Sequence, residues 1–154
     1  MGNKKKKIFN NLISLLEENQ KLSLPVKISK GKVKEDWIDY NGHMNMAYYV
    51  QCFEESSDVL LEYMDLGYRY AVDEQKGVFV IKCEINYRKE LNFNENFIIC
   101  LEELVCKGKK LIVGLKMLNT NDEIVADYKI LNLNVDFKSK RSITFSQKVI
   151  KQLI

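Results

Sequence analysis

The sequence contains few of the residues that metal centres and several catalytic motifs require. His43 is the only histidine, and none of the four cysteines stands in a C-x-x-C pair. A zinc site would therefore lack its usual nitrogen and sulfur ligands, so we expect no metal. Motifs of the forms G-x-S-x-G, G-x-x-x-x-G-K, G-x-G-x-x-G and H-E-x-x-H are also absent, which argues against the classes that carry them. We expect no cofactor either, and any chemistry that uses a histidine must use His43.

An excess of charge of one sign is likewise missing. The chain has 24 Lys and Arg against 21 Asp and Glu, which gives a net charge of +3. Lys4 to Lys7 supply four of the positive charges, so the remaining 150 residues carry a net charge of −1. This charge balance excludes the basic surface of a nucleic-acid-binding domain. In addition, no apolar run reaches the ~20 residues that a membrane-spanning helix needs. We expect neither a nucleic-acid partner nor a stable membrane anchor.

The cysteines also indicate a compartment. All four lie inside apolar runs, where a reduced cysteine behaves as a small buried hydrophobic residue. Disulfides persist in oxidising compartments and are rare in the cytosol. The pattern therefore predicts a reducing, cytoplasmic location.

The length of 154 residues fits a single domain preceded by a short extension. Residues 1–21 form a basic N-terminal extension, and residues 22–154 form the domain. Within the extension, apolar residues recur at helical spacing from Ile8 to Leu16, which predicts a short amphipathic helix over residues 8–19.

The first half of the domain predicts one irregular strand and one long helix. Residues 22–36 mix β-branched residues with lysines and contain Pro25, which is typical of an irregular or edge strand. The apolar positions between Asn45 and Leu66, beginning with Met46, recur at helical spacing and predict a long helix with one buried stripe.

The second half predicts four consecutive strands with short connections. Apolar and polar residues alternate from Phe79 to Tyr87, and further strands are expected at residues 96–105, 111–118 and 123–137. In the last strand the apolar positions change from even to odd numbers near Ile130 and Leu131, which predicts a bulge or bend there. Short connections imply antiparallel pairing, so we expect an α+β fold in which a curved antiparallel sheet wraps around one long helix. A short helix is expected within residues 143–154.

The segment before the long helix carries the densest polar pattern of the chain. Asp39, Asn41, His43 and Asn45 stand at every second position, so an extended backbone would project them to one side. A helix N-terminus follows, with free N–H groups and a positive partial charge that can stabilise an anion. The same residues also fit an ordinary helix cap and turn, in which Asn45 is the N-cap and His43 an interior group.

A resemblance to a known family favours the catalytic interpretation. The pattern D-x-N-G-H-x-N-x-x-x-Y, from Asp39 to Tyr49, resembles the active-site loop of hotdog-fold thioesterases in the 4-hydroxybenzoyl-CoA thioesterase superfamily. Its D-x-N-x-H core is similar to that of long-chain acyl-ACP thioesterases. The resemblance extends over residues 24–150, includes Ile85 to Glu90, and implies a hotdog fold.

The resemblance implies a role for each residue of the loop. Asp39 would be the general base or the nucleophile toward a thioester carbonyl, and Asn41 and His43 would position water, the carbonyl or the carboxylate. Backbone N–H groups of Gly42 or His43 would form the oxyanion hole, where loss of one donor typically costs about 100-fold in rate or more. Asn45 and Tyr49 would contribute to substrate binding.

The resemblance also implies partners. The substrate would be an acyl-CoA or an acyl-ACP, hydrolysed to a free acid and a thiol. The minimum unit would be a homodimer, or a dimer of dimers, with residues 78–87 of one subunit facing the loop of the other.

Nearby aromatic and acidic residues leave further alternatives open. The aromatic residues around the loop are Trp37, Tyr40, Tyr48 and Tyr49. Aromatic faces can hold a quaternary ammonium group, and the arrangement is similar to that of betainyl-CoA thioesterases. Core packing would explain these residues as well. Glu54 and Glu55 are expected to be structural, since nine helical residues place Glu54 about 14 Å from Asn45.

Two other functions compete with hydrolysis. A non-catalytic acyl-binding or dimerisation module is compatible with the same fold, because fold does not determine function. An acyl-thioester hydratase is less compatible, since the chain has a single proline, Pro25, and none beside His43.

Overall fold

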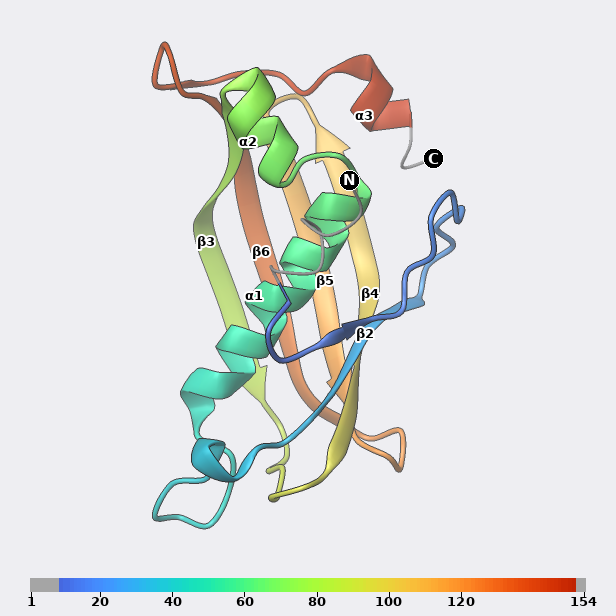
Figure 1. Cartoon of the computed structure of the whole chain (residues 1–154), viewed down its shortest axis with the longest axis vertical. Helices are drawn as coiled ribbons and strands as arrows, with labels where there is room; N and C mark the ends of the chain where they lie inside the picture. Colours follow the sequence, from blue (N-terminus) through green and yellow to red (C-terminus); the bar gives the residue numbers. More distant parts are fainter. Residues whose placement is uncertain (1–8, 152–154) are drawn as a thin grey trace.

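The computed structural model describes residues 9–151, which form one antiparallel sheet curled around a long helix (Figure 1). The strand order is β1-β2-β4-β5-β6-β3, and β7 pairs with β6. This is the α+β arrangement that the sequence predicts. The strands are β1 (Ile13–Ser14), β2 (Val26–Lys32), β3 (Lys76–Tyr87), β4 (Asn96–Lys107), β5 (Lys110–Leu118), β6 (Ile124–Asp136) and β7 (Arg141–Ser142); the helices are α1 (Met46–Tyr63), α2 (Tyr68–Glu74), α3 (Gln147–Lys151) and a 3₁₀ helix (Glu35–Trp37).

The long helix α1 forms where a capping asparagine precedes an amphipathic run. The Asn45 side chain accepts a hydrogen bond from the N–H of Ala47 at 3.0 Å, which satisfies one of the free donors at the helix start. Phe53 and Leu60 are fully buried in the core. Met46, which the sequence assigns to the buried stripe, is instead 62% exposed, because it stands at the open end of the helix and lines a surface groove.

The last long strand, β6, keeps one face toward the core along its length. The predicted bulge at residues 130–131 of this strand is wrong, because the buried positions stay even-numbered through Asn132 and Asn134. Both buried asparagines have hydrogen-bond partners, which removes the cost of burying an amide. Asn132 Nδ2 donates to the carbonyl of Leu111 at 3.1 Å, and Asn134 Oδ1 accepts from the hydroxyl of Tyr70 at 2.6 Å.

A bulge that changes the face of a strand occurs in β3. The β3–β6 register shifts between Val80 and Lys82, so Ile81 is the extra residue. Residues opposite one another in an antiparallel pair share a face, which places Val80 and Cys83 on the concave side and Phe79 on the other. The single apolar face predicted for this strand is therefore divided between the two sides of the sheet.

β3 is also the edge of the sheet, and its apolar residues are not covered in the single chain. Phe79 is 50% exposed, Val80 46% and Ile81 53%. Its other side pairs with β6 (Figure 1). An exposed edge that carries large apolar side chains is a surface to which another chain can pair.

The N-terminal segment is extended rather than helical. The helix predicted over residues 8–19 is wrong from Phe9 onward, and residues 1–8, the first part of the predicted extension, lie outside the described residues. β1 pairs with β2, and beyond it the N–H of Leu15 donates to the carbonyl of Ile28 at 2.9 Å. The edge of β2 supplies main-chain partners, whereas a helix of about 12 residues is marginal by itself. Tertiary pairing therefore overrides the helical spacing.

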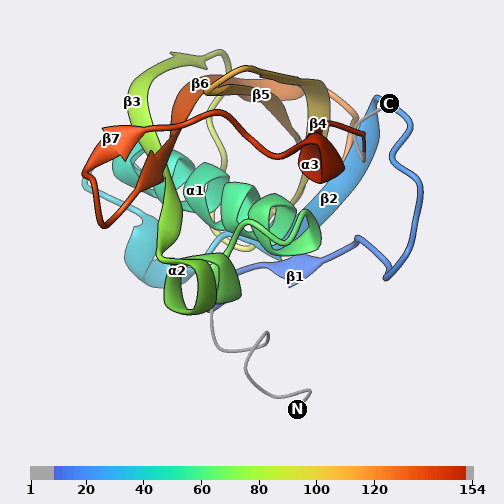
Figure 2. The ribbon, with the colours of Figure 1, turned by 90° about the horizontal axis from the view of Figure 1, so that it is seen from above.

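Neighbouring side chains of the extended segment differ in their burial. Leu12 is 5% exposed and points at Gly31, where an added Cβ would lie 2.7 Å from the Leu12 side chain. Ile13 is 62% exposed. The segment lies on the side of α1 away from β5 and β6, so α1 is enclosed between it and the sheet (Figure 2).

Two short helices complete the chain. α3 confirms the helix expected near the C-terminus, and residues 152–154 lie outside the described part. α2, which the sequence analysis does not predict, follows Gly67 and precedes β3. Among the residues described, no helix combines the length and apolar character needed to cross a membrane.

The N-terminal segment gives a test of strand against helix. Leu12→Ala should lower the free energy of unfolding by about 2–4 kcal/mol, because it leaves a cavity against Gly31. Ile13→Ala should change it by less than about 0.5 kcal/mol, because that side chain is exposed. Urea denaturation of both variants measures the difference. Equal losses would contradict the strand, since Leu12 and Ile13 both belong to the apolar stripe of the predicted helix.

Candidate active site

The polar segment before α1 forms a tight hairpin loop. The N–H of Gly42 donates to the carbonyl of Asp39 at 3.0 Å, and the N–H of Asp39 donates to the carbonyl of His43 at 3.2 Å. Gly42 adopts a φ of 83°, which glycine reaches without strain. The backbone is therefore not extended over this segment, and the turn considered for it is present. The hairpin instead folds back so that Asp39 and Asn45 meet across its base.

The Asp39 carboxylate is held by both of its oxygen atoms. Oδ1 accepts from the backbone N–H of Asn41 at 2.8 Å, and Oδ2 accepts from the side-chain amide of Asn45 at 2.9 Å. The other end of the Asn45 amide caps α1 through the N–H of Ala47. One side chain therefore fixes the carboxylate directly beside the positive end of the helix.

Two backbone N–H groups of the loop and the helix start remain available. Within residues 9–151, neither the N–H of His43 nor that of Met46 has an acceptor. The N–H of Gly42, expected as an alternative oxyanion donor, is already engaged by the carbonyl of Asp39 in the turn. Unlike the N–H of Gly42, those of His43 and Met46 are therefore free to donate. Met46 is absent from the sequence-based assignment, although its place as the first helical residue is the signal that identifies it.

The loop forms one wall of a surface groove of about 670 Å³. Asp39 is half-buried in it, and the side chains of Asn41 and His43 are exposed. The interior location considered for His43 is therefore wrong. The opposite wall is the chain that leaves β3, residues 87–90.

Two tyrosines hold the walls together. The Tyr49 hydroxyl accepts from the N–H of Leu91 at 3.1 Å and donates to the carbonyl of Lys89 at 3.4 Å. Burial raises the pKa of Tyr49 to about 12, so it keeps its proton at neutral pH. The Tyr87 hydroxyl donates to the carbonyl of Met46 at 3.0 Å, and its ring meets that of Tyr49 edge-to-face at 5.3 Å. Tyr49, expected to bind substrate, lines the groove, but its hydroxyl is engaged in hydrogen bonds to Lys89 and Leu91.

Sequence reasoning does not assign the second wall to the site. About 40 residues separate Tyr49 from its partners in residues 89–91. The spacing of residues in the sequence does not indicate a contact between segments this far apart in the chain. The resemblance includes residues 85–90, which is the one signal in the sequence that could have drawn attention to them.

The helix carboxylates have structural partners. Glu54 Oε1 accepts from the hydroxyl of Tyr128 at 2.8 Å, and burial together with this carboxylate raises the pKa of Tyr128. Glu55 accepts from both the N–H and the side-chain amide of Asn11, at 3.1 and 2.7 Å. Each carboxylate therefore anchors another part of the chain to α1.

Of the aromatic residues around the loop, only Tyr40 is fully presented to solvent. Trp37 is 3% exposed and stacks on Tyr48, with ring centroids 5.4 Å apart. Tyr49 is buried, whereas Tyr40 is 98% exposed at the tip of the loop. Core packing thus accounts for Trp37 and Tyr49. In the described part of the chain, no group of three or more His, Cys, Asp or Glu side chains could hold a metal ion.

Comparisons with known proteins agree with this fold. The model of the thioesterase-like superfamily matches residues 33–153. The chain is 25% identical over 130 residues to an L-carnitine dehydrogenase/betainyl-CoA thioesterase of Rhizobium meliloti, covering 84% of this chain and 26% of that protein. It is 23% identical over 123 residues to a betainyl-CoA thioesterase of Pseudomonas aeruginosa, covering 79% and 77%. The chain thus spans about a quarter of the length of the first relative.

Solved structures share the architecture. A Staphylococcus aureus protein in complex with CoA superposes with a TM-score of 0.79 at 18% identity, covering 88% of this chain and 85% of that one. The probable thioesterase YbaW of Escherichia coli gives 0.69 at 20% identity, covering 83% and 96%. These similarities confirm the hotdog fold that the sequence predicts.

The two functions of the Asn45 side chain can be separated by substitution. Asn45→Ala removes the cap and should lower the free energy of unfolding by about 1 kcal/mol. Asn45→Ser keeps a capping oxygen, so it should recover most of that loss, although it cannot reach Asp39 in the same way. Thermal and urea denaturation of the pair measure the cap. If both variants were equally destabilised, the capping geometry would be contradicted.

Proposed function

The chain belongs to the thioesterase-like superfamily, and on this premise we propose that it hydrolyses an acyl-CoA thioester to a free acid and the CoA thiol. One observation carries the proposal. The Asp39 carboxylate lines an open groove and is held at the N-terminus of α1 by Asn41 and Asn45, next to two free N–H groups. A base or nucleophile beside an anion-stabilising site is what acyl transfer requires.

The geometry supports two routes through the same carboxylate. As a general base, Asp39 takes a proton from water, and the water oxygen attacks the thioester carbonyl carbon. As a nucleophile, Asp39 attacks that carbon itself, and water then hydrolyses the mixed anhydride. In both routes the carbonyl oxygen becomes negative and accepts hydrogen bonds from the N–H groups of His43 and Met46. The electron pair of the broken C–S bond leaves with sulfur as a thiolate.

The exposed side chains of the loop complete the site. Asn41 and His43 line the groove beside Asp39, where they position water or the substrate carbonyl. A thiolate departs without a strong acid, so the reaction does not need a second histidine. The proposed substrate is an acyl-CoA, and an acyl-ACP, which carries the same thioester, is the alternative.

The acyl group itself has one specific candidate. Named relatives are betainyl-CoA thioesterases, and the groove here carries the exposed rings of Tyr40 and Tyr87 together with the carboxylate of Glu90. Aromatic faces and a carboxylate suit a quaternary ammonium group. A substrate panel should therefore include betainyl-CoA and its neutral isostere 3,3-dimethylbutanoyl-CoA, so that a preference for the cation is visible at constant shape.

Replacement of Asp39 tests the catalytic assignment. Asp39→Asn keeps the side-chain volume and removes the reactive charge, so the protein should fold normally and lose about 100- to 10,000-fold in kcat. Release of free thiol from the acyl-CoA panel measures this. Activity within a few fold of the unmodified protein would refute the role of Asp39. A non-catalytic acyl-binding module, or a hydratase, would bind acyl-CoA without releasing thiol.

We further propose that the minimum active unit is a homodimer formed through β3. Its edge is unpaired, and Phe79, Val80 and Ile81 expose large apolar surfaces that pairing with a second copy would cover. The same strand leads directly into the groove wall at residues 87–90, so an interface there would border the site.

Light scattering should give a mass of twice the 18.0 kDa of the chain. Ile81→Lys places a charge in the proposed interface and should shift the mass toward the monomer, with a loss of activity. Lys82→Glu, at the next position of the same exposed edge, tests whether any charge change there has this effect. A fully active 18.0 kDa monomer at assay concentration would overturn the proposal.

A further inference from the structure

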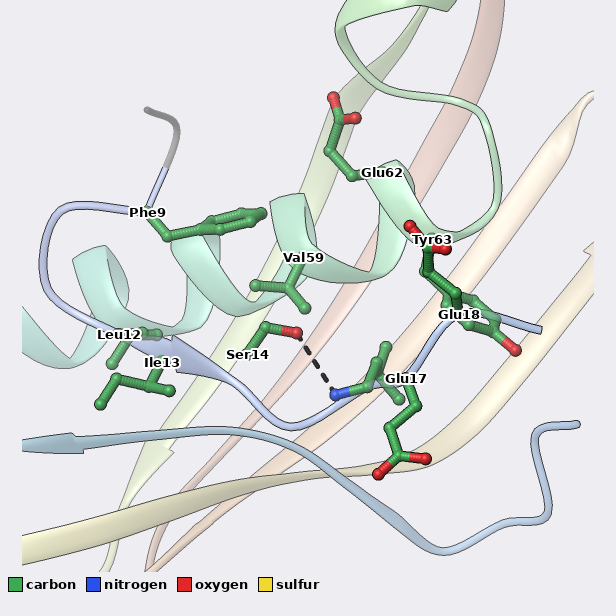
Figure 3. Close-up of a pocket in the computed structure, with 10 residues that line it drawn as sticks. Phe9, Leu12, Ile13, Ser14, Glu17, Glu18, Val59, Glu62 and Tyr63 are labelled. Carbon is green, nitrogen blue, oxygen red and sulfur yellow. Dashed lines mark hydrogen bonds between the residues drawn. The ribbon is translucent and has the colours of Figure 1, made fainter. Parts of the chain in front are cut away.

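A second groove lies between the N-terminal segment and α1, apart from the site at Asp39. It has a volume of about 510 Å³, and none of the residues that line it lines the groove at Asp39 (Figure 3). One wall comes from residues 9–18, which precede the family match that begins at residue 33. The groove is therefore formed in part by a segment outside the region shared with the family.

The groove exists because the N-terminal segment is fixed to α1 at one place and then diverges. Asn11 is anchored by two hydrogen bonds to Glu55, and Leu12 is buried beside it. From there the chain pairs with β2, and Leu15 bonds to Ile28. The segment thus follows β2 instead of α1, which leaves an open channel along the helix.

The channel is apolar over much of its length. Figure 3 shows Phe9 lying along α1 above Val59, with Leu12 and Ile13 on the opposite side. Ile13 is 62% exposed, so its apolar surface is available to a ligand. Burial of an alkyl chain against such surfaces is favourable, because it removes apolar surface from water.

The charged residues of the channel are all acidic. Glu17, Glu18 and Glu62 line it, and none of the lining residues within residues 9–151 is a lysine or an arginine. Within residues 9–151, none of these three carboxylates forms an ion pair. Glu62 is held in place because it accepts the N–H of Tyr68 at 2.5 Å, and the ring of Tyr63, the next residue along α1, also faces the channel.

From this arrangement we infer that the channel binds an amphiphile with an aliphatic chain and an ammonium head group. The alkyl chain lies along Phe9, Ile13 and Val59, and the cation lies among Glu18, Glu62 and the ring of Tyr63. Carboxylates without an ion-pair partner and an aromatic face both attract a cation, and the described lining residues offer no basic side chain to an anionic head. For the same reason the phosphates of CoA are not expected here, so the site is separate from the proposed hydrolysis of acyl-CoA.

Three probes of equal chain length test the head group. Isothermal titration calorimetry with octyltrimethylammonium, octyl sulfate and 1-octanol, each below its micelle concentration, should show saturable one-site binding of the cation. The anion should bind at least tenfold more weakly, and the neutral alcohol should fall between them. Equal binding of all three probes, or no binding of the cation, would overturn the inference and leave the channel to another occupant, such as a polypeptide segment.

Variants locate the binding. Glu18→Gln should weaken binding of the cation about three- to tenfold and leave that of 1-octanol unchanged, whereas Glu35→Gln, an exposed glutamate elsewhere, should change neither. Ile13→Ser should weaken all three probes, because it removes apolar surface that they share. Asp39→Asn and excess free CoA should have no effect. Loss of cation binding with Asp39→Asn, or competition by CoA, would place the cation in the other groove and contradict the inference.

Discussion

The site depends on the side chain of Asn45, which joins a carboxylate to the start of a helix. Its oxygen caps α1 through the N–H of Ala47, and its nitrogen donates to Asp39. Capping requires that Asn45 Oδ1 points at the helix N–H groups. In that orientation of the amide, Asn45 Nδ2 points at the Asp39 carboxylate. The helix start therefore orients Asp39, and the positive end of the helix lies beside this carboxylate.

The curvature of the sheet explains both the covered and the uncovered surfaces. Register shifts interrupt the ladders between β2 and β4, β4 and β5, β5 and β6, and β3 and β6, and such bulges increase the local twist. The curled sheet encloses α1 without covering the β3 edge. The apolar surface that remains on β3 is the physical basis for proposing a second copy there.

The sequence predicts the parts of the fold that depend on the local spacing of apolar and polar residues. The long helix, the antiparallel strands and the C-terminal helix follow from local patterns, and Asn45 as the N-cap of the long helix follows from the loop sequence. The failures involve partners distant in the chain. The chain within residues 9–19 pairs with β2 instead of forming a helix. Asn134 stays on the buried face because its side-chain oxygen accepts a hydrogen bond from the hydroxyl of Tyr70. The groove wall at residues 87–90 is likewise defined by contacts with Tyr49 and Met46 that no local pattern contains.

The most direct test of the account is a crystal structure of the Asp39→Asn protein with an unhydrolysed acyl-CoA. The account predicts that the thioester carbonyl carbon lies beside residue 39 and that its oxygen faces the N–H groups of His43 and Met46, at about 2.7–3.1 Å. A thioester bound outside the groove at residue 39, or a carbonyl oxygen directed away from the start of α1, would contradict it.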